Sequence, residues 1–402
     1  MKAYFKAAAC MLVLILFVSG LSGCTTYENF VKTFSTEKEP EDVVRIGVFE
    51  PLSGEDSEFG KLEKQGIELA HELYPKALNK QVELVYADNK SDIYTAESVI
   101  MDLISKRPAV VLGSYGSVYS LVAAQHLEEA QIPAIAITNT NPLVTANNPF
   151  YFRVCLVESF QGVALAKYAV QELGCSSAAI MKPLNDDTAT AVSQIFSDKM
   201  VQLTENPNAV QLTVEYEKDA KDLREQLQQL KDSGAKVVFL PVDADEAADI
   251  VKQAYKLKLD TIFLGTQEWE TDEFIKDVGP AASNIAFSTY FDSKSAITEM
   301  TDTFLRAYKQ KYGEDAVPDS AVALGFDAYM IAVDSLNRIG TALDGDLMRR
   351  SILIEREFNG ASGIISFDGK GDPIKSVVIK AIINGEYKSV YTMVPVFEPV
   401  EL

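Results

Sequence analysis

The sequence predicts an α/β protein with two lobes, each built on a doubly wound parallel sheet. Short apolar runs of strand length alternate with amphipathic stretches along most of the chain, and this alternation is typical of βαβ crossovers. The pattern occurs in two similar halves. The length of 402 residues also exceeds that of a usual single domain, which favours two lobes.

The first half consists of units of strand, loop and helix. The stretch 95–106 shows the helical signal well, because its apolar residues recur three and four positions apart and form one stripe. Pro51 and Gly54 form a turn that ends the first strand. The predicted strands are 44–49, 82–87, 110–112 and 134–137, and the predicted helices are 62–74, 95–106 and 118–130.

The second half repeats this alternation but ends in strands alone. The last two of these strands are joined by Asn384 and Gly385, a strong signal for a hairpin. Two long helices precede them. The predicted strands are 178–181, 213–216, 237–240, 261–265, 285–291, 364–367, 376–383 and 387–393, and the predicted helices are 159–173, 188–203, 219–233, 245–256, 297–312 and 320–339.

The first 24 residues predict an export signal. Lys2 and Lys6 precede an apolar run at 7–18 that is shorter than the about 20 residues a membrane span needs. The following Leu-Ser-Gly-Cys resembles a bacterial lipobox, which implies cleavage before Cys24 and a lipid on that cysteine. Residues 1–23 are then the signal peptide, and the polar stretch 24–43 is a flexible tether. An ordinary signal peptide with an incidental cysteine is the alternative.

Composition and charge limit the class of partner. Hydrophobic residues make up 47% of the chain and charged residues 24%, as in globular proteins. The formal net charge of -21 argues against nucleic acid or anionic lipid as a direct partner, because their phosphates would be repelled. A small anionic ligand is still compatible with this charge, since local dipoles govern a crevice.

No enzyme, cofactor or metal chemistry is predicted. His71 and His126 lie in amphipathic stretches without a Cys or acid at metal-ligand spacing. The segment 113–117 is not a nucleophile elbow, since it reads Gly-Ser-Tyr-Gly-Ser and lacks the spacing of Gly-x-Ser-x-Gly. Beyond the signal and Cys24, the cysteines are Cys155 and Cys175, which either form a disulfide in an oxidising envelope or are two separate thiols.

Two hydroxyl residues follow neighbouring strands of the first half. Ser117 lies after strand 110–112 and Thr140 after strand 134–137. Parallel strands end along one edge of a sheet, where the following helix presents unpaired N–H groups and the positive end of its dipole. The pattern therefore predicts a site for a carboxylate that needs no charged residue. Helix capping by Ser117 and a turn hydroxyl at Thr140 are the structural alternatives.

Several short motifs resemble those of one family. The opening stretch 44–54, with Gly60 after it, is similar to that of type I periplasmic binding proteins of the leucine/isoleucine/valine-binding branch. Further agreement lies at 88–89, 113–117, 141–142, 151–153, 239–240, 252–254, 263–265, 304–308, 325–328 and 367–372.

This resemblance implies a specific domain organisation. Two Rossmann-like lobes would be joined by three crossovers, near 153–156, 286–290 and 364–367. Lobe 1 would comprise 44–154 plus 290–362, and lobe 2 would comprise 155–289 plus 363–402. In such proteins a ligand binds between lobes that close by hinge motion.

The resemblance also implies ligand-binding residues in lobe 1. Ser117 and Thr140 fall where the family binds the α-carboxylate of an amino acid, and Thr138 falls where a backbone carbonyl receives the ammonium group. These groups suit the two charges, because a carboxylate accepts hydrogen bonds and an ammonium donates them.

Lobe 2 departs from the family pattern. Asp187 stands where an aromatic residue is common, and Asp243 lies near the position of a second one. The ammonium-binding acid falls on Gln267, and a loop shift of one residue would place it on Glu268. These differences count against a plain branched-chain aliphatic ligand. Alternatively, Asp187 and Asp243 are solvated acids at helix starts, and Trp269 either lines the cleft or packs in the core.

Together these observations predict a lipid-anchored solute-binding protein of the cell envelope, facing the periplasm or the outside. It would capture a small amphoteric ligand, an amino acid or a relative, between the lobes and pass it to the permease of an ABC transporter. Its contact with the membrane would be the lipid on Cys24. The alternative is a lipoprotein of the same fold that regulates a cell-wall enzyme or a sensor through protein contacts.

Overall fold

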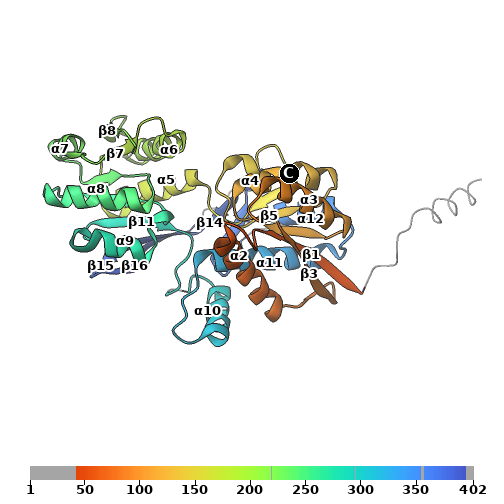
Figure 1. The fold of residues 1–402 in the computed structure, drawn as a ribbon. Helices are drawn as coiled ribbons and strands as arrows, with labels where there is room; N and C mark the ends of the chain where they lie inside the picture. Colours follow the sequence, from red (N-terminus) through yellow and green to blue (C-terminus); the bar gives the residue numbers. More distant parts are fainter. Residues whose placement is uncertain (1–41, 219, 295, 355–356, 395–402) are drawn as a thin grey trace, which may run out of the picture. The chain divides into compact units, whose positions relative to one another are not determined.

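The structure is a computed structural model that describes residues 42–394 except 219, 295 and 355–356, and omits the side chains of 158, 159 and 272 (Figure 1). The predicted signal peptide, Cys24 and nearly all of the tether lie outside the described residues. Among the residues that are described, no helix combines the length and the apolar character needed to cross a membrane.

The first sheet has six strands in the order β2-β3-β1-β4-β5-β6. Strands β1, β4, β5 and β6 are parallel, with Ile46 beside Val110 and Val111 beside Ala134. The predicted doubly wound arrangement is therefore confirmed in this half. The strands are β1 (Val43–Glu50), β2 (Lys76–Ala77), β3 (Lys80–Asp88), β4 (Val110–Gly113), β5 (Ala134–Ala136) and β6 (Tyr151–Arg153).

Two of the helices associated with this half pack unusually closely. A Cβ atom on Gly66 of α2 would lie 1.9 Å from the carbonyl oxygen of Val322 in α11, so only glycine permits this approach. Figure 1 shows the two helices side by side. Most residues of α11 are buried, and the helix has the predicted limits 320–339. The helices are α2 (Ser57–Leu73), α3 (Ile93–Ser105), α4 (Ser117–Glu129), α10 (Glu299–Tyr312), α11 (Ser320–Ile339) and α12 (Gly345–Leu353).

The second sheet has seven strands in the order β16-β15-β11-β10-β9-β7-β8. Strands β8, β7, β9, β10 and β11 are parallel. The predicted hairpin across Asn384 and Gly385 is confirmed as the antiparallel pair β15 and β16. The strands are β7 (Ala178–Pro183), β8 (Val210–Tyr216), β9 (Val237–Phe239), β10 (Ile262–Gly265), β11 (Ile285–Thr289), β15 (Val377–Ile383) and β16 (Glu386–Met393).

The helices of the second half differ from prediction mainly at their ends. The predicted helix 219–233 begins only at Arg224, and the predicted helix 159–173 ends in a π-helical turn. The short helix α9 was not predicted, because its seven residues are too few to show a periodic stripe. The helices are α5 (Glu158–Lys167), which continues into the π-helical turn Tyr168–Glu172, α6 (Asp187–Thr204), α7 (Arg224–Ser233), α8 (Ala244–Lys256) and α9 (Asp272–Val278).

A third, small antiparallel sheet corrects the position of the last crossover. It contains β12 (Phe358–Gly360), β13 (Gly363–Phe367) and β14 (Pro373–Lys375). The predicted strand 364–367 exists, but both of its edges are occupied by β12 and β14. The chain joins the second sheet only at β15, so the third crossover falls after β14 and not at 364–367. The limits of the two lobes stay a prediction.

The two described cysteines are separate thiols. Cys155 is buried, and its Sγ donates to the carbonyl oxygen of Asn139 at 3.0 Å. Burial raises the pKa of this thiol to about 12. The sequence left open a disulfide or two separate thiols, and the structure has two separate thiols.

Candidate functional site

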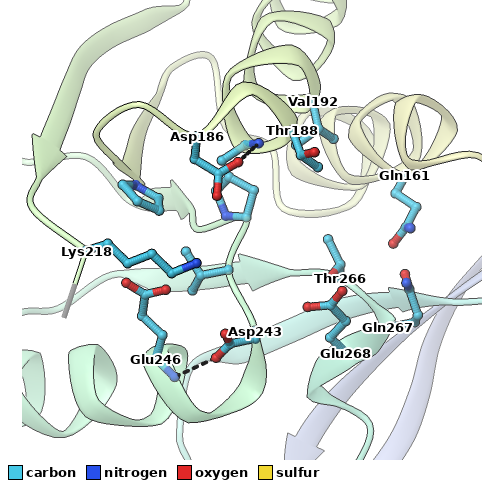
Figure 2. Close-up of a pocket in the computed structure, with 14 residues that line it drawn as sticks. Gln161, Asp186, Thr188, Val192, Lys218, Asp243, Glu246, Thr266, Gln267 and Glu268 are labelled. Atoms are coloured by element: carbon cyan, nitrogen blue, oxygen red, sulfur yellow. Dashed lines mark hydrogen bonds between the residues drawn. The ribbon is translucent and has the colours of Figure 1, made fainter. Parts of the chain in front are cut away.

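A pocket of about 180 Å³ lies at the carboxyl ends of the strands in the second sheet (Figure 2). Its walls come from the end of β7, from the residues that follow β7, β8, β9 and β10, and from α5, α6 and α8. Figure 2 shows Lys218 at one end of the pocket and Gln161 with Gln267 at the other. The lining residues are Gln161, Pro183, Asp186, Thr188, Ala189, Val192, Lys218, Pro241, Val242, Asp243, Glu246, Thr266, Gln267 and Glu268.

Two aspartates of the pocket begin helices. Asp186 Oδ1 accepts from the backbone N–H of Ala189 at 2.8 Å, and Asp243 Oδ1 accepts from that of Glu246 at 2.9 Å. Each aspartate is the N-cap of its helix, α6 or α8. The bonds satisfy backbone donors that would otherwise lack partners. They also hold both carboxylates at the pocket.

Two glutamines of the pocket retain unused hydrogen-bonding capacity. Gln161 is 1% exposed, and its Oε1 accepts from Ser288 Oγ at 2.8 Å. Its Nε2 is buried and has no partner among the described residues, and the same holds for Oε1 of Gln267. Figure 2 shows the two amides pointing toward one another. A buried polar atom without a partner is costly, which favours a ligand that supplies one.

Only some of the site residues predicted in the second half line the pocket. Asp243 and Glu268 line the same pocket, whereas Asp187 is an exposed residue of α6 outside the lining. The preceding residue, Asp186, lines the pocket instead. Asp187 thus does not line this pocket, and its role in ligand binding stays a prediction.

Trp269 packs in the core of the second half. It is 0% exposed, and its Nε1 donates to the carbonyl oxygen of Val242 at 2.8 Å. Its ring lies 5.3 Å from that of Phe274, measured between centroids. Of the two alternatives for this residue, packing is confirmed. Trp269 therefore supports the loop that carries Glu268.

In the first half, Ser117 and Thr140 follow β4 and β5, which are adjacent parallel strands. Both residues are half-buried. Gly116 is the N-cap of α4 and Ser117 its first helical residue, so the capping interpretation of Ser117 is wrong. The two hydroxyl residues thus lie on neighbouring loops at one edge of the sheet, beside the N-terminus of α4.

Thr138 connects the same loops to a buried pair of acids that the sequence analysis missed. Its Oγ1 donates to Glu63 Oε1, and the backbone N–H of Tyr115 donates to Glu50 Oε2 at 2.8 Å. Both glutamates are 0% exposed. Burial and the charge of Glu63 raise the pKa of Glu50 well above its usual value. Burial also raises the pKa of Glu63 to about 7, against the lowering effect of its hydrogen bonds.

Arg153 holds the loop that carries Thr140. Its Nη1 donates to the carbonyl oxygens of Asn139 at 2.9 Å and Asn141 at 2.8 Å, the two neighbours of Thr140 in sequence. Its Nε lies 2.7 Å from Asp372 Oδ1 in an ion pair whose arginine side chain is 0% exposed. The loop conformation therefore depends on a buried charge.

An aromatic pair lies beside these loops. Phe59 stacks on Tyr115 with ring centroids 4.6 Å apart, and Phe59 is 49% exposed. Burial raises the pKa of Tyr115, and the carboxylates of Asp56, Glu63 and Glu268 raise it further. Glu268 of the second half thus acts electrostatically on a loop of the first.

The described residues contain no group of three or more His, Cys, Asp or Glu side chains placed to hold a metal ion. What they offer is a sheet edge with hydroxyl groups and backbone amides, and a pocket with carboxylates and side-chain amides. These groups can bind a small polar molecule. Such a site is suited to a solute-binding protein.

Comparison with known proteins identifies the family. The family described as periplasmic binding protein matches residues 43–378, and the chain belongs to it. The resemblance noted in the sequence, including the leucine/isoleucine/valine-binding branch, is confirmed by the similar proteins. These proteins are substrate-binding proteins and not enzymes, and membership of the family indicates an extracytoplasmic location.

The similar proteins cover most of the chain. The "Leu/Ile/Val-binding protein homolog 2" of Brucella abortus is 25% identical over 343 residues, which are 82% of this chain and 87% of that protein. The leucine-binding protein LivK of Thermotoga maritima is 31% identical with a TM-score of 0.70, covering 87% of this chain and 98% of that one. LivJ of Streptococcus pneumoniae in complex with isoleucine is 22% identical with a TM-score of 0.69, covering 87% and 99%.

Proposed function

We propose that the protein is a lipid-anchored, extracytoplasmic solute-binding protein that captures an amino acid or a related amphoteric molecule for ABC-type import. The observation that carries this proposal is the position of Ser117 and Thr140 on neighbouring loops at the carboxyl edge of the first sheet. Two hydroxyl groups and the N-terminal amides of α4 suit a carboxylate there. The similar proteins of Brucella abortus and Thermotoga maritima carry names that refer to amino acids.

The second half would bind the other charge. Glu268 lines the pocket and is exposed, and its carboxylate would bind the ligand's ammonium group. Its effect on the pKa of Tyr115 supports a position near the first half. A ligand that contacts both halves would favour the closed arrangement, because in the open arrangement it contacts only one of the two halves.

Calorimetry across the twenty amino acids tests the proposal. At least one should bind, and the double variant Ser117→Ala/Thr140→Ala should abolish binding without unfolding the protein. The matched control is Ser98→Ala/Ser105→Ala, which removes two exposed hydroxyl groups from α3 in the same half. Unchanged binding by the first variant would refute the carboxylate site at Ser117 and Thr140, and no binding of any amino acid by the unaltered protein would refute the proposed ligand class.

The anchor and the partner need separate experiments. Cys24→Ala should release the protein from the membrane fraction and abolish incorporation of a labelled fatty acid, as the Leu-Ser-Gly-Cys motif implies. Crosslinking in cells should capture a permease. Capture of a cell-wall synthase or a kinase instead, together with a pocket that binds no solute, would favour the alternative of an envelope regulator.

A further inference from the structure

The pocket of the second half carries a surplus of negative charge. Four carboxylates line it, and Lys218 is the one cation among its described lining residues. The charges of these acids also affect the neighbouring residue Tyr216. Burial raises the pKa of Tyr216, and the charges of Glu246, Asp243 and Asp186 raise it further. The four acids are Asp186, Asp243, Glu246 and Glu268.

The proposed function uses only part of this charge. If Glu268 binds the ammonium group of an amino acid, three carboxylates and Lys218 still face the remainder of the ligand. An aliphatic side chain there would remove water from these acids and give no hydrogen bond in return. A cationic side chain would replace the lost water with charge-assisted hydrogen bonds.

A second observation, independent of the acids, also points to a ligand with many hydrogen-bonding groups. Gln161 is 1% exposed and lines the pocket, yet its Nε2 lacks a partner among the described residues. The Oε1 atom of Gln267 is likewise buried and unpartnered there. A branched hydrocarbon satisfies neither atom. A guanidinium or ammonium group donates hydrogen bonds and can satisfy Gln267 Oε1, whereas Gln161 Nε2 is itself a donor and needs an acceptor atom of the ligand.

From this we infer that the ligand is an amino acid with a positively charged side chain, of the arginine or lysine type, and that Asp186 and Asp243 select for the charge. This inference rests on the proposed function and names its substrate class. Both aspartates are fixed by their capping bonds, so their carboxylates are positioned before the ligand arrives.

The test compares ligands that differ in charge but hardly in shape. Calorimetry on the purified protein should show L-arginine binding at least about tenfold more tightly than L-citrulline, or L-lysine binding at least about tenfold more tightly than its Nε-acetyl derivative. The double variant Asp186→Asn/Asp243→Asn should reduce this preference to about twofold or less, since asparagine retains the helix caps but not the charge. The control is Asp344→Asn at the N-cap of α12, outside the pocket lining, which should leave the preference unchanged.

The outcomes separate the inference from the proposed function. Tight binding of leucine, or of the neutral analogues as strongly as the cations, overturns the inference and leaves amino acid capture intact. A charge preference that persists in the asparagine variant also overturns it, because the selecting residues would then be others. Absence of binding for every amino acid refutes both.

Discussion

The two halves of the candidate site are built in different ways. In the first half, the loops that carry Thr138 and Thr140 are held by hydrogen bonds to two buried ionisable side chains, Glu63 and Arg153. In the second half, the charged groups of the pocket are at least partly exposed, and two of them, Asp186 and Asp243, stand at helix starts. The comparison shows that one half of the site is part of the folding core, whereas the other half lies on its surface.

This difference has a consequence for how binding specificity can change. Replacing a residue that braces the first half leaves a buried charge without its partner, which costs stability. Replacing a pocket residue of the second half alters an exposed or half-exposed group, which costs little. We therefore expect the first half to fix the common part of the ligand, the carboxylate, and the second half to select its side chain.

The largest expected effect is a loss of stability when Arg153 is replaced. Arg153→Met should lower the free energy of unfolding by about 3–5 kcal/mol, because Asp372 and the carbonyl oxygens of the Thr140 loop lose their buried partner. Urea unfolding followed by circular dichroism measures this. The matched control is Arg224→Met, which breaks an ion pair with Asp222 whose side chains are 75% and 58% exposed and should leave the free energy of unfolding nearly unchanged. Equal effects would contradict the comparison.

The next effect is a pH dependence that arises in the first half. The pKa of Glu63 is raised in the folded state to about 7 from its usual 4.5. The folded protein therefore binds more protons than the unfolded chain in this range, and its stability falls as the pH rises from about 4.5 to 7. The total loss from this group is about 3 kcal/mol.

Glu63→Gln should reduce this loss, since the amide remains uncharged at every pH. The measurement is the free energy of unfolding from urea titrations at pH 5 and pH 7. Other groups near Glu63 are Glu50, Thr138 and Asp319, and all three are retained in the variant. The control Glu58→Gln changes an exposed acid of the same helix and should leave the slope as it is. An identical slope in wild type and Glu63→Gln would show that Glu63 does not hold the extra proton.

The contrast between the halves also explains what the sequence could predict. Local sequence patterns predict the alternation of strands and helices, the limits of α11 and the loops that carry Ser117 and Thr140. The pairing of Glu50 with Glu63 does not, because it joins the end of a strand to the buried face of a helix. An acid at position 63, among the apolar residues of that face, was the one available signal.

The pocket of the second half was predicted only in part for a related reason. The resemblance singled out Asp243 and Asp187 because aromatic positions of the family fall on or near them, and it missed the lining residue Asp186, the N-cap of α6, by one position. The buried amide of Gln161 lies within a predicted helix, and sequence periodicity does not show which helical polar residue faces a pocket.

A moderate effect is expected at the boundary between pocket and core. A Cβ atom on Gly265 would lie 2.3 Å from the ring of Trp269, so Gly265→Ala must displace that ring. Overpacking of this kind costs about 1–3 kcal/mol. Trp269 is the one tryptophan of the chain, so its emission maximum should move to longer wavelength in the variant. An unchanged spectrum would mean that the ring adapts without gaining contact with water.

The smallest effect on stability is expected in the pocket itself. Asp243→Asn keeps the hydrogen bond to the N–H of Glu246, since asparagine is also a favoured N-cap residue. The free energy of unfolding should therefore stay within about 0.5 kcal/mol of wild type. By contrast, Asp243→Leu removes the cap and should cost about 1 kcal/mol. A loss of several kcal/mol for the asparagine variant would place Asp243 in the folding core, and the distinction between a braced half and a selective half would then fail.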